Sequence, residues 1–286
     1  MESILRIAIQ KKGRLSEKSL QLLKEAGISI SNGSSRLKAQ ASNFPLEVLF
    51  LRDDDIPQYV AEGVAQAGIL GENVVAEKAF PVETKLELGF AKCRLSLAIP
   101  REIDYPGPQW FEGKKVATTY PGILQQFLEK EGVHAQTESI SGSVEVAPGI
   151  GLADGICDIV STGSTLFTNG LKEVETVMRS QAILVASPQM NQAQEALLEQ
   201  LIFRMQAVLR ARKRKYILLN APNEAIPAIS QLLPGMKSPT VLPLAEEGWS
   251  SLHTVVHEQE FWDVIDQLKK LGAEGILVTN IEKMIL

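Results

Sequence analysis

The sequence predicts an α/β protein with two α/β lobes and a separate C-terminal module. Three observations predict it. Short apolar strands alternate with amphipathic helices up to about residue 185. A long helix over Gln194 to Arg212 then carries one apolar stripe. Residues 216–286 change to the order strand-helix-strand-strand-helix-strand, which is typical of a ferredoxin-like module.

The first lobe begins with a strand over Ile4 to Ile9, a polar loop, and a helix over Leu15 to Ala26. The loop lies at the carboxyl end of the strand, where open α/β sheets bind ligands. Lys11 and Lys12 are equally consistent with a solvated turn and with a ligand site. Arg14 indicates a ligand more strongly, because its planar guanidinium suits phosphate.

Two more strand-helix units complete this lobe. The strand Leu46 to Leu51 precedes Arg52-Asp53-Asp54-Asp55, whose acids favour the positive end of the next helix. A magnesium role for these acids is the less favoured alternative. The strand Ala67 to Leu70 ends in Gly71-Glu72-Asn73 and a third helix. The strand Arg94 to Pro100 then leaves the first lobe.

The second lobe continues the alternation with two strands and the helix between them, at Lys115 to Thr119, Ile123 to Glu131 and Ala135 to Ile140. Thr118 and Tyr120 lie at a strand end, where Tyr120 either stacks on a base or packs in the turn. Val174 to Val185 is predicted to be extended and to return to the first lobe.

A phosphate-type loop is predicted between these segments. The strand Gly155 to Val160 is apolar except for Asp158, and it leads into Ser161-Thr162-Gly163-Ser164-Thr165 and a short helical turn. Such a loop offers backbone N–H groups and hydroxyls to a phosphate, and Asp158 would accept hydrogen bonds from ribose hydroxyls. Ordinary turn chemistry explains the loop residues alone, but Asp158 and the flanking small-residue segments favour phosphate.

The segment Ser141 to Leu171 resembles the phosphoribosyl-binding signature of the ATP phosphoribosyltransferases, and the similarity extends over essentially the full length. It includes five further segments: Gln10-Lys11-Lys12-Gly13-Arg14-Leu15-Ser16, Arg52-Asp53-Asp54-Asp55-Ile56-Pro57, Gly71-Glu72-Asn73, Cys93-Arg94-Leu95-Ser96 and a C-terminal piece typical of the long form. The resemblance implies a bilobed catalytic part like the type II periplasmic binding proteins, with an ACT-like regulatory domain. The implied domains are 1–97 with 178–212, 98–177, and 213–286.

The implied reaction is magnesium-dependent. The adenine N1 of ATP attacks C1 of phosphoribosyl pyrophosphate (PRPP), and pyrophosphate leaves, in the first step of histidine biosynthesis. We expect the protein to bind and orient its substrates without an assigned acid or base. The residues expected at PRPP are Glu145, Asp158, Ser161, Thr162, Gly163, Ser164 and Thr165. Those expected at ATP and pyrophosphate are Lys11, Arg14, Glu72, Arg94, Thr118 and Tyr120. Magnesium is expected to travel on the pyrophosphate.

The C-terminal module contains no recognisable catalytic set. Its predicted elements are a strand at Tyr216 to Leu219, a helix capped by Asn223 and ending at Leu233, strands at Thr240 to Leu244 and Leu252 to His257, a helix at Phe261 to Leu271, and a strand at Gly275 to Thr279. His253 and His257 share a strand face and are interpreted as structural. By resemblance, L-histidine binds here as feedback inhibitor near Thr240 and Gly275. We also expect a homo-oligomer, a dimer and hexamer by resemblance.

Composition excludes several other classes. The 286 residues are 45% apolar and 22% charged, with net charge −5, which argues against nucleic acid as a bulk partner. No apolar run is long enough for a membrane helix, and lysines follow the first apolar stretch, so a cytoplasmic protein is expected. Cys93 and Cys157 lack C-x-x-C spacing.

Two rival hypotheses remain: a non-catalytic solute-binding or sensory module of the same bilobed shape, and a non-catalytic regulatory paralogue. A recognisable signal peptide and DNA-binding segment are missing, which counts against the first. The basic loop beside an intact phosphate loop counts against the second.

Overall fold

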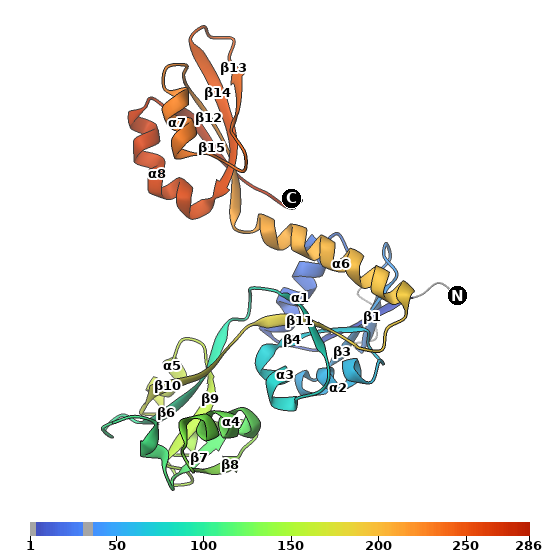
Figure 1. The fold of residues 1–286 in the computed structure, drawn as a ribbon, viewed down its shortest axis with the longest axis vertical. Coiled ribbons are helices and arrows are strands. Elements are labelled where there is room, and N and C mark those ends of the chain that lie inside the picture. Colours follow the sequence, from blue (N-terminus) through green and yellow to red (C-terminus); the bar gives the residue numbers. More distant parts are fainter. Residues whose placement is uncertain (1–3, 31–36) are drawn as a thin grey trace. The chain divides into compact units, whose positions relative to one another are not determined.

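The computed structural model describes residues 4–30 and 37–286. The chain divides into two compact units. Unit 1 takes Met1–Gln21 and Ile28–Glu199, and unit 2 takes Leu22–Gly27 and Gln200–Leu286. Unit 1 contains two sheets and unit 2 contains one (Figure 1).

The first sheet of unit 1 has the strand order β2-β3-β1-β4-β11-β5. Its strands are β1 (Leu5–Gln10), β2 (Lys38–Gln40), β3 (Leu46–Leu51), β4 (Ala67–Gly71), β5 (Glu83–Glu87) and β11 (Ala182–Ala186). The three central strands, β3, β1 and β4, are parallel, and the other pairings are antiparallel. The apolar run of β1 is buried, as expected for a central parallel strand.

Helices follow the carboxyl ends of those parallel strands. They are α1 (Arg14–Glu25) after β1, η1 (Asp53–Asp55) and α2 (Ile56–Ala61) after β3, and α3 (Glu72–Lys78) after β4. The three connecting segments therefore meet at one edge of the sheet. A hydrogen bond from the Lys11 N–H to the Leu51 carbonyl, 2.8 Å, joins two of them.

The second sheet of unit 1 has the order β10-β6-β9-β7-β8. Its strands are β6 (Cys93–Pro100), β7 (Lys115–Thr118), β8 (Gln136–Ser139), β9 (Gly155–Val160) and β10 (Leu171–Ser180), and its helices are η2 (Pro108–Phe111), α4 (Pro121–Glu131), η3 (Val144–Val146) and α5 (Ser164–Thr168). Strands β8, β7 and β9 are parallel. Their carboxyl ends again share an edge, to which the phosphate-type loop belongs.

The chain crosses from one sheet of unit 1 to the other twice. It enters the second sheet through β6 and leaves through β10, and these strands pair antiparallel from Leu171 opposite Pro100 to Ser180 opposite Cys93 (Figure 1). It then inserts β11 between β4 and β5 of the first sheet. The predicted α/β class with two lobes is confirmed, and each lobe has its own sheet.

Unit 2 contains the end of α6 (Gln192–Ala211), then β12 (Arg214–Pro222), α7 (Ile226–Leu232), β13 (Thr240–Pro243), β14 (Trp249–His257), α8 (Glu258–Lys270) and β15 (Glu274–Asn280). The sheet order is β13-β14-β12-β15, with every pairing antiparallel. Both α7 and α8 pack on one face, around Ile217, Leu252 and Phe261. The predicted ferredoxin-like module is confirmed.

Two local expectations are corrected. Asn223 does not cap the first helix of the module, because that helix begins at Ile226 and its N-cap is Ala225. The Asn223 side chain instead accepts a hydrogen bond from the Ser250 hydroxyl, 2.6 Å. Strands β2 and β5 were not expected, since both are short and polar at sheet edges. None of the described helices combines the length and apolar character that crossing a membrane requires.

Candidate functional site

The phosphate-type loop is the connection between β9 and α5. Gly163 is the N-cap of α5 and has a φ of +81°, a conformation that favours glycine. Ser161, Thr162, Ser164 and Thr165 are exposed. The Thr162 and Ser164 hydroxyls lie 3.0 Å apart. The loop therefore presents hydroxyls and a glycine backbone to solvent at the carboxyl end of a buried strand.

Two carboxylates lie beside this loop, both half-buried. Asp158 is on β9, and Glu145 is on η3, which contacts β9. Burial raises the pKa of Asp158, the Ile159 N–H at 2.7 Å lowers it, and the charge of Glu145 raises it. Two neighbouring carboxylates with free acceptor sites suit a vicinal diol, such as that of a ribose.

The expected cations Lys11 and Arg14 lie at the carboxyl edge of the first sheet. Both are exposed, and no ion pair joins either of them to a described acid. Glu72 is the first residue of α3 at the same edge and is half-buried. This edge therefore carries exposed cations without ion-pair partners next to the acids Glu72 and Asp53–Asp55.

Thr118 and Tyr120 differ in what they can contact. Thr118 is fully buried, and its hydroxyl donates to the Cys157 carbonyl at 2.6 Å and accepts from the Tyr120 N–H at 2.9 Å. We therefore revise Thr118 from a substrate contact to a support for Tyr120. Burial first, then the charges of Asp158, Asp53 and Asp54, raise the pKa of Tyr120, so its hydroxyl stays neutral. Tyr120 thus lies within electrostatic range of acids from both lobes.

Arg94 is held by an ion pair that the sequence did not reveal. Its guanidinium donates to both carboxylate oxygens of Glu173 on β10, and Ser96 donates to the same carboxylate at 2.8 Å. The bond from Arg94 is the main cause that lowers the pKa of Glu173. Arg94 also donates to the Ser161 carbonyl at 3.3 Å. Arg94 therefore links β6 and β10, the strands that connect the two sheets, to the phosphate-type loop. Its guanidinium is already paired with Glu173.

Asp53, one of the three acids for which a magnesium role was the less favoured alternative, differs from its neighbours in burial. Its Oδ1 atom is buried and has no hydrogen-bond partner in the described part of the chain. Burial, and then the neighbouring Asp54, raise its pKa from 3.8 to about 6. The available signal was its place directly after a central strand, but nothing in three consecutive acids distinguishes the buried one.

Two pockets are formed by described residues of unit 2. One, of about 550 Å³, is lined by Thr240 together with Tyr216, Lys237 and His253. Within it the Tyr216 hydroxyl lies 2.6 Å from Nδ1 of His253, so His253 faces the pocket. Gly275 is exposed, with a φ of +58°, and a methyl group there would lie 3.3 Å from the Asn220 amide nitrogen. Thr240 thus belongs to a cavity, whereas Gly275 is not among the residues that line it.

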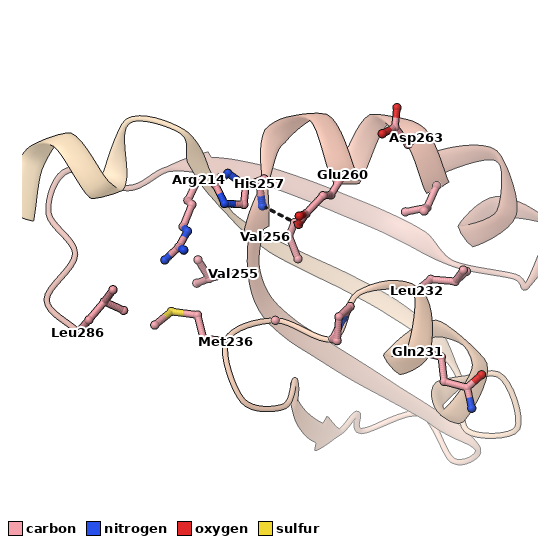
Figure 2. Close-up of a pocket in the computed structure, with 13 residues that line it drawn as sticks. Arg214, Gln231, Leu232, Met236, Val255, Val256, His257, Glu260, Asp263 and Leu286 are labelled. Carbon is pink, nitrogen blue, oxygen red and sulfur yellow. Dashed lines mark hydrogen bonds between the residues drawn. The ribbon is translucent and has the colours of Figure 1, made fainter. Parts of the chain in front are cut away.

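The second pocket, of about 680 Å³, lies on the helical side of the same sheet (Figure 2). Arg214, Met236, Val255 and Glu260 are among its lining residues. The Glu260 carboxylate accepts a hydrogen bond from the His257 N–H at 3.1 Å at the start of α8, in keeping with the structural role expected of His257. Across residues 4–30 and 37–286, no group of three or more His, Cys, Asp or Glu side chains is placed to hold a metal ion.

Comparison with known proteins gives consistent matches. Residues 52–207 match the family described as ATP phosphoribosyltransferase, and residues 211–283 match "HisG, C-terminal domain". A relative from Phocaeicola vulgatus named ATP phosphoribosyltransferase is 59% identical over 283 residues, 99% of this chain and 100% of that protein. One of the same name from Cytophaga hutchinsonii is 57% identical over 285 residues, 100% of both chains. A solved ATP phosphoribosyl transferase (HisG:HisZ) complex from Thermotoga maritima shares 29% identity over 72% of this chain and 99% of that chain, with a TM-score of 0.64.

Proposed function

Because the chain belongs to the ATP phosphoribosyltransferase family, we propose how its residues carry out that reaction. The enzyme transfers the phosphoribosyl group of PRPP to N1 of the adenine of ATP and releases pyrophosphate, the first step of histidine biosynthesis. The N1 lone pair forms the new bond to C1 of the ribose. The C1–O bond breaks, and its electron pair leaves with the pyrophosphate oxygen.

PRPP binds to the second lobe in this proposal. Its 5′-phosphate accepts hydrogen bonds from the loop Ser161 to Thr165, and Gly163 lets the backbone approach because it has no side chain. The ribose hydroxyls donate to Asp158 and Glu145. The exposed loop hydroxyls and the two adjacent carboxylates support this assignment. Arg94, which was expected at ATP and pyrophosphate, instead holds this loop through the Ser161 carbonyl, because its guanidinium is already paired with Glu173.

ATP and the leaving pyrophosphate bind at the edge of the first lobe. Lys11 and Arg14 are exposed cations without ion-pair partners in the described chain, so their charge is available to phosphates. Glu72 accepts a hydrogen bond from the nucleotide. Tyr120 contacts the same nucleotide in one of two ways: its neutral hydroxyl donates a hydrogen bond, or its ring stacks on the base. Thr118 acts only through Tyr120.

Catalysis then rests on positioning and charge. Breaking a bond at a sugar C1 builds positive charge on the ribose, and the half-buried Asp158 and Glu145 lie where they stabilise that charge. The cations of the first lobe stabilise the negative charge that grows on pyrophosphate. Magnesium would be carried by the substrate pyrophosphate, whose oxygens, with waters, would supply most of its ligands. Asp158 and Glu145 are hard oxygen donors, which fit that ion.

Unit 2 is proposed to regulate the enzyme. L-histidine would bind in the pocket that contains Thr240, with the carboxylate near Lys237. The sheet face away from α7 and α8 exposes several apolar side chains, including Tyr216, Leu242 and Leu277. Apolar patches of this kind mark interaction surfaces, which supports assembly into a homo-oligomer.

The single observation that carries the proposal is the exposed phosphate-type loop beside two half-buried carboxylates. The test incubates the purified protein with ATP, PRPP and magnesium and weighs the products. Phosphoribosyl-ATP and pyrophosphate are expected in equal amounts. Unchanged substrates from well-folded protein would overturn the proposal in favour of a non-catalytic paralogue, and ADP or AMP alone would indicate a hydrolase.

A further inference from the structure

One side chain joins the two lobes of unit 1 at the start of α4. Glu77, on α3 of the first lobe, accepts hydrogen bonds from two backbone N–H groups of α4 in the second lobe. Its Oε1 lies 3.0 Å from the nitrogen of Gly122, and its Oε2 lies 2.9 Å from that of Ile123. Glu77 is half-buried, so water competes only in part for these bonds.

The start of α4 depends on this carboxylate. The N-cap residue Tyr120 makes no side-chain capping bond, and Pro121 has no N–H to donate. The N–H groups of Gly122 and Ile123 have no partner within the helix, so they need an acceptor from elsewhere. A carboxylate is the most favourable one, because the N-terminus of a helix carries partial positive charge. Both of its oxygens are used.

Helix α3 also packs against the second lobe at Ala76, the residue before Glu77. Ala76 and Tyr120 both pack against the apolar cluster of the second sheet that contains Leu95 and Leu124. Gly122 leaves room for the contact, since a methyl group there would lie 3.3 Å from both carboxylate oxygens of Glu77. The α3–α4 contact is therefore close, apolar at Ala76 and hydrogen-bonded at Glu77.

The two helices carry residues that the proposed function assigns to one substrate. Helix α3 begins with Glu72, and Tyr120 directly precedes α4. The distance between Glu72 and Tyr120 thus depends on how α3 and α4 are held together. The proposed PRPP contacts differ, because Glu145, Asp158 and the loop after β9 all belong to the second lobe. Their spacing does not depend on a contact between lobes.

We propose that Glu77 is a positioning residue for ATP: by capping α4 from α3, it sets the spacing of the two ATP-binding faces. The inference rests on the proposed assignment of Glu72 and Tyr120. It requires that removal of Glu77 weakens ATP binding and leaves PRPP binding intact. A cap with only a stabilising role would weaken the binding of both substrates in parallel, as the folded fraction falls.

The experiment compares the wild-type chain with Glu77→Ala and Glu77→Gln. The matched control is Glu129→Ala, on the exposed side of α4, where the Glu129 side chain accepts from Gln125 on the same helix. Hydrogen exchange of the Gly122 and Ile123 amides is measured without substrates, and Kd values for ATP and PRPP are measured by calorimetry. In Glu77→Ala we expect these amides to exchange at least about 10-fold faster and the Kd for ATP to rise about 10-fold, as for loss of a bond to a charged group. The Kd for PRPP stays within about 2-fold.

Glu77→Gln keeps one acceptor oxygen and should give intermediate values, whereas Glu129→Ala should match the wild type. Unchanged amide exchange in Glu77→Ala would show that the contact is absent in solution. Faster exchange with both Kd values unchanged, or with both raised alike, would show that the cap has no positioning role. If the wild type binds neither substrate, the proposed function fails, and the exchange result still tests the contact by itself.

Discussion

The unpartnered carboxyl of Asp53 makes a quantitative prediction about the stability of the first lobe. Its pKa is raised from 3.8 to about 6, chiefly by burial and secondly by Asp54. Well below pH 3.8 the carboxyl is protonated in both the folded and the unfolded chain. As the pH rises from 3.8 to about 6, the unfolded chain ionises while the folded chain keeps its proton, so the free energy of unfolding falls, and it levels off above about 6.

The size of the effect follows from the shift. At 1.36 kcal/mol per pKa unit, the change from 3.8 to about 6 corresponds to about 3 kcal/mol at pH 8. Water near the partly exposed side chain screens part of this, so we expect about 2 kcal/mol. Asp53→Asn removes the charge and keeps the shape. It should stabilise the first lobe at pH 8 by that amount and by much less at pH 4.5.

The assay is native-state hydrogen exchange of amides in the central strand β1, which reports the opening of this lobe, at several pH values after correction for intrinsic rates. Asp55→Asn, at an exposed position of the same turn, is the matched control and should show no such trend. Asp54→Asn should shift the wild-type transition to lower pH, since it removes the like charge. A difference between wild type and Asp53→Asn that is constant from pH 4.5 to 8, or that has the opposite sign, would refute the reasoning.

Four other substitutions test the proposed roles. Gly163→Ala, at a φ of +81°, should weaken PRPP binding in calorimetry by about 1–3 kcal/mol and leave ATP binding unchanged. If the variant binds PRPP as tightly as the wild type, the loop is an ordinary turn without a role in binding. Arg14→Lys keeps the charge but loses the planar fork, so turnover should fall while PRPP titrations stay normal, and the reverse pattern would move Arg14 to the PRPP side. Glu173→Gln should loosen Arg94 and raise the KM for PRPP several-fold, whereas an unchanged KM would make the ion pair purely structural. Thr240→Val should raise the histidine concentration for half-inhibition at unchanged basal activity, and unaltered inhibition would remove Thr240 from the effector site.

The local parts of the fold were predictable because their signals are local. The strands Leu46–Leu51 and Gly155–Val160 have the bounds that their apolar runs predict. The glycine and hydroxyl residues after the second strand likewise indicated an exposed loop. The helix cap expected at Asn223 was wrong, although Asn is a typical capping residue, because its side chain accepts a hydrogen bond from the Ser250 hydroxyl.

The interactions that were missed all depend on distant residues. Arg94 reads as a free cation in the sequence, and only the pairing of β6 with β10 brings Glu173 to it. Thr118 lies at the end of a strand, where the sequence suggested a substrate contact. In the structure it is buried, and its hydroxyl donates to a carbonyl of the neighbouring strand β9. Glu77 meets α4 across 45 residues of chain, and no periodicity encodes such a contact.

The insertion of β11 between β4 and β5 has a consequence for the order in which the protein is made. While the ribosome extends the chain, the first sheet lacks an inner strand until residues 182–186 emerge, about 100 residues after β5. Strands β4 and β5 meanwhile have unpaired edges, which are liable to join other nascent chains. The second sheet, whose strands lie in one continuous stretch from 93 to 180, can close first. A chain released after residue 180 should therefore protect the second lobe from protease but not the first, because the lobe proposed to bind PRPP then has all its strands and the lobe proposed to bind ATP lacks β11.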